Sequence, residues 1–160
     1  MTIMLRINGV SRTVDVAAGE TLLEVLRREG FVGVKCGCGT GDCGACAVLL
    51  NGRAVNSCLT LAGKVDGAEI LTVEGLASVE RLHPLQEAFL DEGAVQCGYC
   101  TPGMLMSGID LLTRNPNPSE DEIREAISGN LCRCTGYVKQ VRAIQSAAER
   151  MRSGGDDCAT

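Results

Sequence analysis

The most informative segment of the chain is Gly37-Cys38-Gly39-Thr40-Gly41-Asp42-Cys43-Gly44-Ala45-Cys46. Four residues separate its first two cysteines, two separate the next pair, and Cys58 follows after eleven more residues. The glycines permit positive φ angles, and they leave no side chain to block a close approach to the loop. A loop of this composition can curl tightly enough to bring three thiols to one point.

This spacing predicts an iron–sulfur site. Two irons and two sulfides form a compact anionic core, and plant-type loops hold that core with the same C-x4-C-x2-C triplet and a remote fourth cysteine. Inward backbone N–H groups of such a loop stabilise the negative charge. Zinc is the alternative, but zinc sites usually combine two short C-x2-4-C pairs, which fits poorly here. We therefore expect one 2Fe–2S cluster on Cys38, Cys43, Cys46 and Cys58.

Two further features of this loop do not change the predicted ligand set. Gly39 to Gly44 formally match G-x-G-x-x-G, but a dinucleotide site needs a helix to open after the match, and here a strand is predicted to follow. Cys36 is an extra thiol, and using it in place of Cys38 would lengthen the first spacing to six residues. We expect Cys36 to be a bystander that does not bind the cluster.

A second set of cysteines lies in the other half of the chain. Cys97 and Cys100 precede a predicted helix that starts at Pro102, and Cys132 and Cys134 precede one that starts near Tyr137. The positive ends of helix dipoles favour an anionic cluster at such positions. A C-x-C pair holds its sulfurs awkwardly for one tetrahedral zinc ion. The pattern predicts a second 2Fe–2S cluster on these four cysteines.

Composition sets the compartment and excludes some classes of partner. Disulfides need an oxidising compartment, but Arg6 and Asn8 interrupt the first apolar residues almost at once, so we expect no signal peptide. No apolar run approaches the roughly 18 residues that would indicate a membrane span. A cytoplasmic protein with metal-binding cysteines is expected. The net charge of −5 is opposite to that of a nucleic-acid-binding surface.

The first half of the chain has the patterns of strands and one helix. Asn8-Gly9 and Asn51-Gly52 each predict a hairpin, and Thr21 with Glu24 predicts a capped helix that ends at Gly30. The predicted strands cover residues 3–7, 14–16, 46–50, 53–57 and 70–73.

The second half has helical patterns. The expected helix starts are Pro84, Thr101 as a cap before Pro102, Ser119 in a capping box with Glu122, and Val138 at the head of a last helix that reaches Met151. The only histidine, His83, precedes Pro84, so a capping or surface role is favoured over catalysis. The period of the pattern changes near residues 75–83, which predicts domains at 1–77 and 78–153. Residues 154–160, with a free Cys158, are expected to be a disordered tail.

Three strings, together with both cysteine sets, carry a resemblance to a known family. They are Gly37 to Cys46, Gln96-Cys97-Gly98-Tyr99-Cys100-Thr101-Pro102-Gly103, and Gly129-Asn130-Leu131-Cys132-Arg133-Cys134-Thr135-Gly136-Tyr137. In this order they resemble the small iron–sulfur subunit of the molybdenum hydroxylases, the xanthine dehydrogenase family. The similarity covers about residues 3 to 150, and Cys36 stands where a non-thiol residue is expected.

The resemblance implies a fold, partners and a function. It implies an α+β fold, with an N-terminal β-grasp, ferredoxin-like 2Fe–2S domain and a C-terminal four-helix bundle that binds the second 2Fe–2S cluster. It also implies a molybdopterin-binding large subunit and an FAD-binding medium subunit as partners. Single electrons would pass from the molybdenum centre through the C-terminal and then the N-terminal cluster to FAD. Gln96 and Cys134 match positions that approach the pterin.

Two other functions remain open from the residues alone. A stand-alone ferredoxin would use the first cluster, although a mobile carrier needs no second domain. A structural zinc protein would use the same thiols without iron. The chain has no general base or substrate pocket that the sequence identifies, so we expect no catalytic residues of its own within the oxidoreductase.

Overall fold

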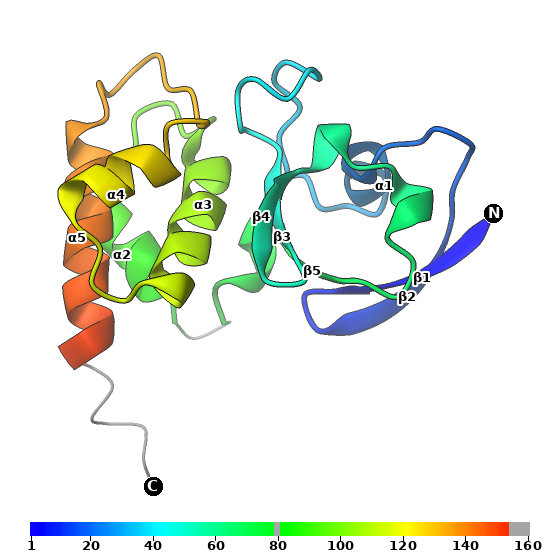
Figure 1. Ribbon diagram of the computed structural model, residues 1–160, viewed down its shortest axis with the longest axis horizontal. Helices are drawn as coiled ribbons and strands as arrows, with labels where there is room; N and C mark the ends of the chain where they lie inside the picture. The colour runs from blue at the N-terminus through cyan, green and yellow to red at the C-terminus, as the bar shows by residue number, and fades with distance from the viewer. Residues whose placement is uncertain (79–80, 154–160) are drawn as a thin grey trace, which may run out of the picture.

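Strands occupy the first part of the chain, and the longer helices follow them (Figure 1). The structure, a computed structural model, describes residues 1–78 and 81–153. Residues 1–78 form a five-stranded sheet with the α-helix α1 (Leu22–Arg28), and residues 81–153 contain four α-helices that pack on one another. The expected tail, residues 154–160 with Cys158, lies outside the described residues.

The sheet of residues 1–78 has the strand order β2-β1-β5-β3-β4. Its strands are β1 (Thr2–Ile7), β2 (Val10–Asp15), β3 (Ala47–Leu50), β4 (Arg53–Asn56) and β5 (Glu69–Leu71). β1 pairs antiparallel with β2 and parallel with β5, and β3 pairs antiparallel with both β4 and β5. The short central strand β5 thus joins the two predicted hairpins into one sheet.

Both Asn-Gly pairs turn these hairpins as predicted. Asn8 has a φ of 50° and Asn51 a φ of 48°, and the glycine after each has a φ of 80°. Positive φ at both central positions is the geometry that matches the twist of a two-residue hairpin.

The last strand ends earlier than the predicted residue 73. The side-chain oxygen of Asn8 accepts a hydrogen bond from Thr72 N at 2.9 Å, and this contact takes the backbone of Thr72 out of the ladder. A short 3-10 turn, Val73–Gly75, follows. A hydrogen bond between residues so far apart in the chain leaves no local pattern in the sequence.

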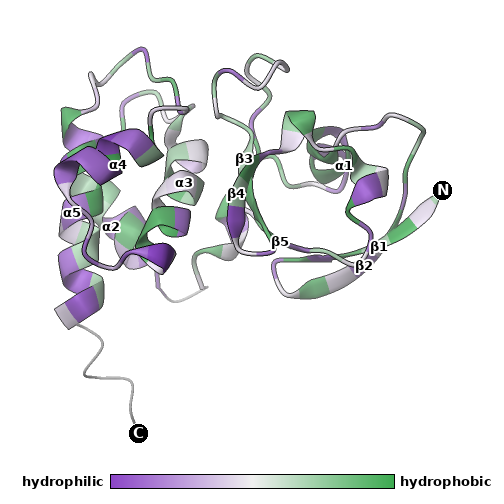
Figure 2. Cartoon of the chain, in the orientation of Figure 1, coloured by the Kyte–Doolittle hydropathy of each residue, from purple (hydrophilic) through white to green (hydrophobic). Residues whose placement is uncertain are grey.

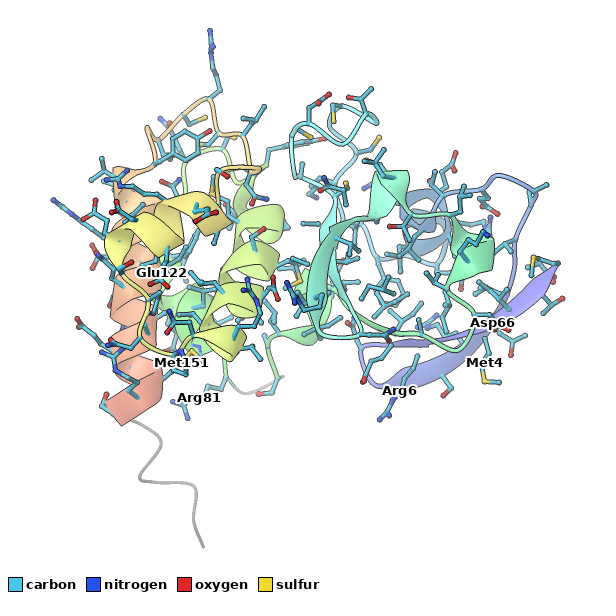
Figure 3. All side chains as sticks on the ribbon, in the orientation of Figure 1. Met4, Arg6, Asp66, Arg81, Glu122 and Met151 are labelled. Atoms are coloured by element: carbon cyan, nitrogen blue, oxygen red, sulfur yellow. The ribbon has the colours of Figure 1, made fainter. Side chains whose placement is uncertain are left out.

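Two of the α-helices begin with the predicted capping boxes. Thr21 Oγ1 accepts from Glu24 N at the start of α1, and Ser119 Oγ accepts from Glu122 N at the start of α4 (Glu120–Ala126). Glu122 is labelled on α4 in Figure 3. Each Glu carboxylate in turn accepts from the backbone N–H of its cap residue at 2.7 Å. These ends were predictable because each box lies within four consecutive residues.

The other helix starts test two predictions. α2 (Pro84–Asp91) is capped by His83, whose Nδ1 accepts from Leu85 N at 3.1 Å, so the capping role of His83 is confirmed. Burial lowers the pKa of His83, which favours the neutral imidazole that this contact needs as an acceptor. α3 (Thr101–Arg114) starts one residue earlier than predicted, because Cys100 is its cap and accepts the bond from Met104 N. α5 (Val138–Ser153) closes the helical part.

Strand β3 contributes to two hydrophobic cores. Val48 faces the core between the sheet and α1, whereas Ala47 and Leu49 face the core of the helices, against α3. The alternation follows from the two-residue period of a strand. Figure 2 shows β3 as hydrophobic and the outer surfaces of α4 and α5 as largely hydrophilic. The two parts of the chain are therefore joined by a packed sheet face. No helix within residues 1–78 and 81–153 is long and apolar enough to cross a membrane.

Candidate iron–sulfur sites

The loops that carry the thiols reach the same side of the molecule, the upper side in Figure 1. They are the loop between α1 and β3, the loop that leads into α3, and the loop between α4 and α5. Figure 3 shows sulfur atoms among the side chains on this side. The sheet and the helices thus present their thiols toward a common region.

The first four predicted thiols form two neighbouring pairs. Cys38, Cys43 and Cys46 come from the loop before β3, and Cys58 comes from the 3-10 turn Ser57–Leu59 that follows β4. The thiols of Cys38 and Cys43 are hydrogen-bonding neighbours, as are those of Cys46 and Cys58. Cys46 and Cys58 are buried while Cys38 is exposed, so the set opens to the surface on one side.

Glycines shape this loop where side chains would collide. A Cβ atom at Gly37 would lie 2.6 Å from Cys43 Sγ, and one at Gly44 would lie 2.4 Å from the carbonyl oxygen of Gly129. Gly44 also has a φ of 67°, which other residues rarely adopt. The loop therefore needs glycine both to gather its thiols and to approach the helical part, and this fits a compact cluster held by four thiolates.

The thiols of this set differ in how readily they ionise. Hydrogen bonds from the Thr40 hydroxyl and backbone N–H, and from Cys43, lower the pKa of Cys38 to about 6. The Thr40 N–H lies 3.4 Å from Cys38 Sγ. Burial, together with the neighbouring Cys46 thiol, raises the pKa of Cys58 to about 11. Iron binds thiolates, so a cluster held here would require the buried thiols to lose their protons.

The second four thiols also form two neighbouring pairs, and each pair joins the loop before α3 to the loop before α5. Cys100 neighbours Cys132, and Cys97 neighbours Cys134. Cys97 and Cys100 lead into the N-terminus of α3, and the other two precede α5, as predicted. The macrodipoles of both helices thus favour negative charge here.

Hydrogen bonds again set the ionisation of the second set. Burial and the Cys132 thiol raise the pKa of Cys100 to about 12, and the Cys97 thiol raises that of Cys134. The pKa of Cys132 is lowered: burial opposes this, but hydrogen bonds from Thr135 and from the backbone N–H of Cys134 outweigh it. Cys132 Sγ lies 3.0 Å from Thr135 Oγ1.

In both sets the thiols are neighbours in pairs. Within residues 1–78 and 81–153, no group of three or more His, Cys, Asp or Glu side chains is arranged around the position of a single metal ion.

The loops of the first and second thiol sets also contact each other directly, and the sequence does not predict these contacts. Leu131 N donates to the carbonyl oxygen of Cys43 at 2.9 Å, and the side-chain amide of Asn130 donates to Gly44 O at 3.1 Å. Tyr99 Oη donates to the carbonyl oxygen of Cys36 at 2.6 Å. Asn130, Leu131 and Tyr99 all lie within the quoted strings, but only the folded chain shows what they touch.

Comparisons with known proteins agree with this arrangement. A family model described as a 2Fe-2S iron-sulfur cluster binding domain matches residues 5–72, and one described as a 2Fe-2S binding domain matches residues 72–145. The nicotinate dehydrogenase small FeS subunit of Eubacterium barkeri is 48% identical over 94% of this chain and 96% of its own length. The nicotine 6-hydroxylase small subunit of Paenarthrobacter nicotinovorans is 53% identical over 89% of this chain and 87% of its own.

The fold is shared with a solved structure as well. Quinoline 2-oxidoreductase from Pseudomonas putida 86 contains a chain that matches with a TM-score of 0.92 and 46% identity, covering 96% of this chain and 97% of that one. This chain belongs to the small iron–sulfur subunits of the molybdenum hydroxylases. The resemblance to the xanthine dehydrogenase family is thereby confirmed.

This small iron–sulfur subunit is a component of an oxidoreductase, and its two 2Fe–2S domains serve electron transfer. Family membership favours this function over a free ferredoxin or a structural zinc protein. In the aldehyde oxidoreductase of Megalodesulfovibrio gigas, the matching region is 44% identical and makes up 16% of a longer protein.

The other residues that the sequence singles out in the small iron–sulfur subunit are Gln96, Cys134 and Cys36. Gln96 and Cys134 are both exposed, one before Cys97 and the other before the turn into α5. Cys36 is exposed too, and its carbonyl oxygen takes part in the contact with Tyr99. Thr135 was not singled out from the sequence, although it lies one residue from Cys134.

Proposed function

We propose that this subunit relays single electrons between a molybdopterin centre in a large subunit and FAD in a medium subunit. The hydrogen bond from Leu131 N to Cys43 O carries the proposal. It joins a residue of the first thiol set to the residue directly before Cys132 of the second. A relay through two clusters needs a short, well-packed connection between them, and this contact supplies one.

Each thiol set would hold one cluster in this proposal. Cys38, Cys43, Cys46 and Cys58 would bind the N-terminal cluster, and Cys97, Cys100, Cys132 and Cys134 the C-terminal one. The neighbouring thiol pairs and the glycine-shaped loop support these two sets. Each bound cluster supplies a carrier of one electron at a time.

The finer description of the fold is part of the same proposal. The mixed sheet covered by α1 supports a β-grasp domain over residues 1–77. The mutual packing of α2, α3, α4 and α5 supports a four-helix bundle over residues 78–153.

Exposed apolar side chains around the loops support large protein partners. Leu131, Tyr99 and Val138 lie exposed beside the second thiol set, and Leu59 lies exposed beside the first. Apolar side chains gathered at a functional edge are typical of an interface. We assign the edge with Gln96 and Cys134 to the molybdopterin subunit, with Gln96 in contact with the pterin through its amide. The edge with Leu59 would face the FAD subunit.

A cytoplasmic location is proposed on chemical grounds. The described cysteines of residues 1–78 and 81–153 are all free thiols, and cluster binding needs them reduced.

Metal content and partner retention test the proposal. The purified complex should contain about four irons and four acid-labile sulfides per small subunit, from two 2Fe–2S clusters. It should also contain molybdopterin and FAD in its larger subunits. Two irons per chain, or stoichiometric zinc, would contradict it.

The connecting hydrogen bond can be tested by itself. Leu131→Pro removes the N–H that reaches Cys43 O, because proline has no backbone donor. In stopped-flow reduction by substrate, we expect slower electron transfer from the C-terminal to the N-terminal cluster while both clusters stay bound. Leu131→Ala is the matched control, because it keeps the N–H and trims an exposed side chain. Equal rates in both variants would remove this bond from the relay.

A further inference from the structure

The sulfur of Cys132 lies beside a hydroxyl group. Thr135 Oγ1 is 3.0 Å from Cys132 Sγ, and the backbone N–H of Cys134 points to the same sulfur at 3.4 Å. The distance alone does not show whether the thiol or the hydroxyl is the hydrogen-bond donor. A sulfur that binds iron carries no proton, so in the loaded protein the hydroxyl must be the donor.

Gln140 determines the direction of this hydrogen bond, because its side-chain amide also contacts the Thr135 hydroxyl. Its side chain is fully buried on α5, and Nε2 donates both to the carbonyl oxygen of Ala94, at 3.1 Å, and to Thr135 Oγ1. Turning the amide over would place Oε1 against the Ala94 carbonyl, so the amide orientation is set. Because Thr135 Oγ1 accepts from Gln140, its own hydrogen is left for Cys132 Sγ.

The amide keeps this orientation at a cost. Gln140 Oε1 is buried and has no hydrogen-bond partner among the described residues. Buried polar atoms are almost always paired, so an unpaired one in a core calls for a reason. The two donor contacts of the same amide supply that reason, since both would be lost with an apolar side chain.

We propose that Thr135, oriented by Gln140, donates a hydrogen bond to Cys132 Sγ and thereby raises the reduction potential of the C-terminal cluster. The inference rests on the proposed function, in which Cys132 is a cluster ligand. Reduction adds negative charge that spreads onto the sulfurs, so a donor stabilises the reduced form more than the oxidised form. Thr135 touches the ligand sulfur, and Gln140 is a positioning residue behind it.

A redox titration followed by EPR tests the hydroxyl. Thr135→Val in the cluster-loaded full chain removes the donor but keeps the shape of the side chain. We expect the ratio of reduced to oxidised C-terminal cluster at a fixed potential to fall about tenfold, which for one electron is a lower midpoint by about 59 mV. Thr135→Ser should titrate like the unmodified chain, because it keeps the hydroxyl.

Two controls distinguish a local shift in the midpoint of the C-terminal cluster from a general change in the protein. The N-terminal cluster of the same sample should keep its midpoint. Ser128→Ala removes a hydroxyl that donates to Glu125 O in the same part of the chain, and it should leave both midpoints unchanged. An unchanged C-terminal midpoint in Thr135→Val, or an equal fall in Thr135→Ser, would overturn the inference.

Gln140→Met tests the positioning residue. It fills the buried volume but gives Thr135 no hydrogen, so we expect a smaller fall of the C-terminal midpoint, in the same direction. A C-terminal midpoint equal to that of the unmodified chain would overturn the role of Gln140. A full chain that shows no second cluster signal before any substitution would instead overturn the proposed function, and this inference with it.

Discussion

Cys36 and Cys38 lie two residues apart on one exposed loop, but their surroundings differ. The Cys38 thiol accepts the Thr40 N–H and neighbours the Cys43 thiol. Cys36 contributes its carbonyl oxygen to the contact with Tyr99. Hydrogen bonds to a thiol favour its thiolate form, which is the form that binds iron. The local contacts therefore support the ligand register that the spacing predicts.

Paired substitutions check this register. We expect Cys38→Ala to lose the N-terminal cluster, and with it about half of the iron and sulfide of a two-cluster chain. Cys36→Ala should keep both clusters. Metal analysis and EPR of the reduced variants measure the outcome. Loss of the N-terminal signal from Cys36→Ala, with the signal retained in Cys38→Ala, would assign the ligand to Cys36.

At the scale of single elements, the capping box of α1 has a pH dependence that can be worked out. Hydrogen bonds from the Thr21 backbone N–H and hydroxyl lower the pKa of Glu24. The unfolded pKa is about 4.3, and the folded one lies below it. The stabilisation is therefore complete above that pH and disappears as the pH falls through the folded pKa.

Substitutions in this capping box test its contribution to stability and the direction of its pH dependence. Thr21→Ala should destabilise the chain by about 1 kcal/mol at pH 7, while Thr21→Ser keeps the acceptor and should stay near the unmodified value. The deficit of Glu24→Gln should be present at pH 7 and shrink as the pH falls below about 4. Urea unfolding followed by circular dichroism measures these differences. A deficit in Glu24→Gln that grows on acidification would contradict the assignment.

Elements with a local cause were predictable from the sequence, and elements with a remote cause were not. The hairpins at Asn8 and Asn51 and the box at Ser119 each depend on a few consecutive residues. The early end of β5 depends on Asn8, far back in the chain, and the start of α3 depends on Cys100 already having helical backbone angles. The two thiol sets are predictions from spacing. The hydrogen bond from Leu131 N to Cys43 O joins the two halves of the chain, and it has no local sequence pattern.

At the scale of the whole molecule, an ion pair ties the sheet to the helices. Asp110 on α3 has a mostly buried side chain. Its Oδ1 lies 3.0 Å from Nε of Arg53 on β4, and its Oδ2 lies 3.2 Å from Nη2 of Arg114 on the same helix. Ala47 and Leu49 of β3 pack into the helical core beside it. The contact thus helps hold the relative position of the two thiol-bearing parts.

Asp110→Asn should therefore weaken both parts together. Both arginines are about half exposed or more, so water compensates them partly after the charge is lost, and we expect a loss of about 1–2 kcal/mol, between the values for surface and buried pairs. Glu120→Gln is the matched control, because its pair with Arg124 lies within one exposed helix and should change stability by about 0.5 kcal/mol or less. Urea unfolding should show the helical signal and the visible cluster absorbance lost in one transition at a lower midpoint, since β3 belongs to both cores. If the two signals separated already in the unmodified chain, the halves would unfold independently, and Asp110 could not act as a tie between them.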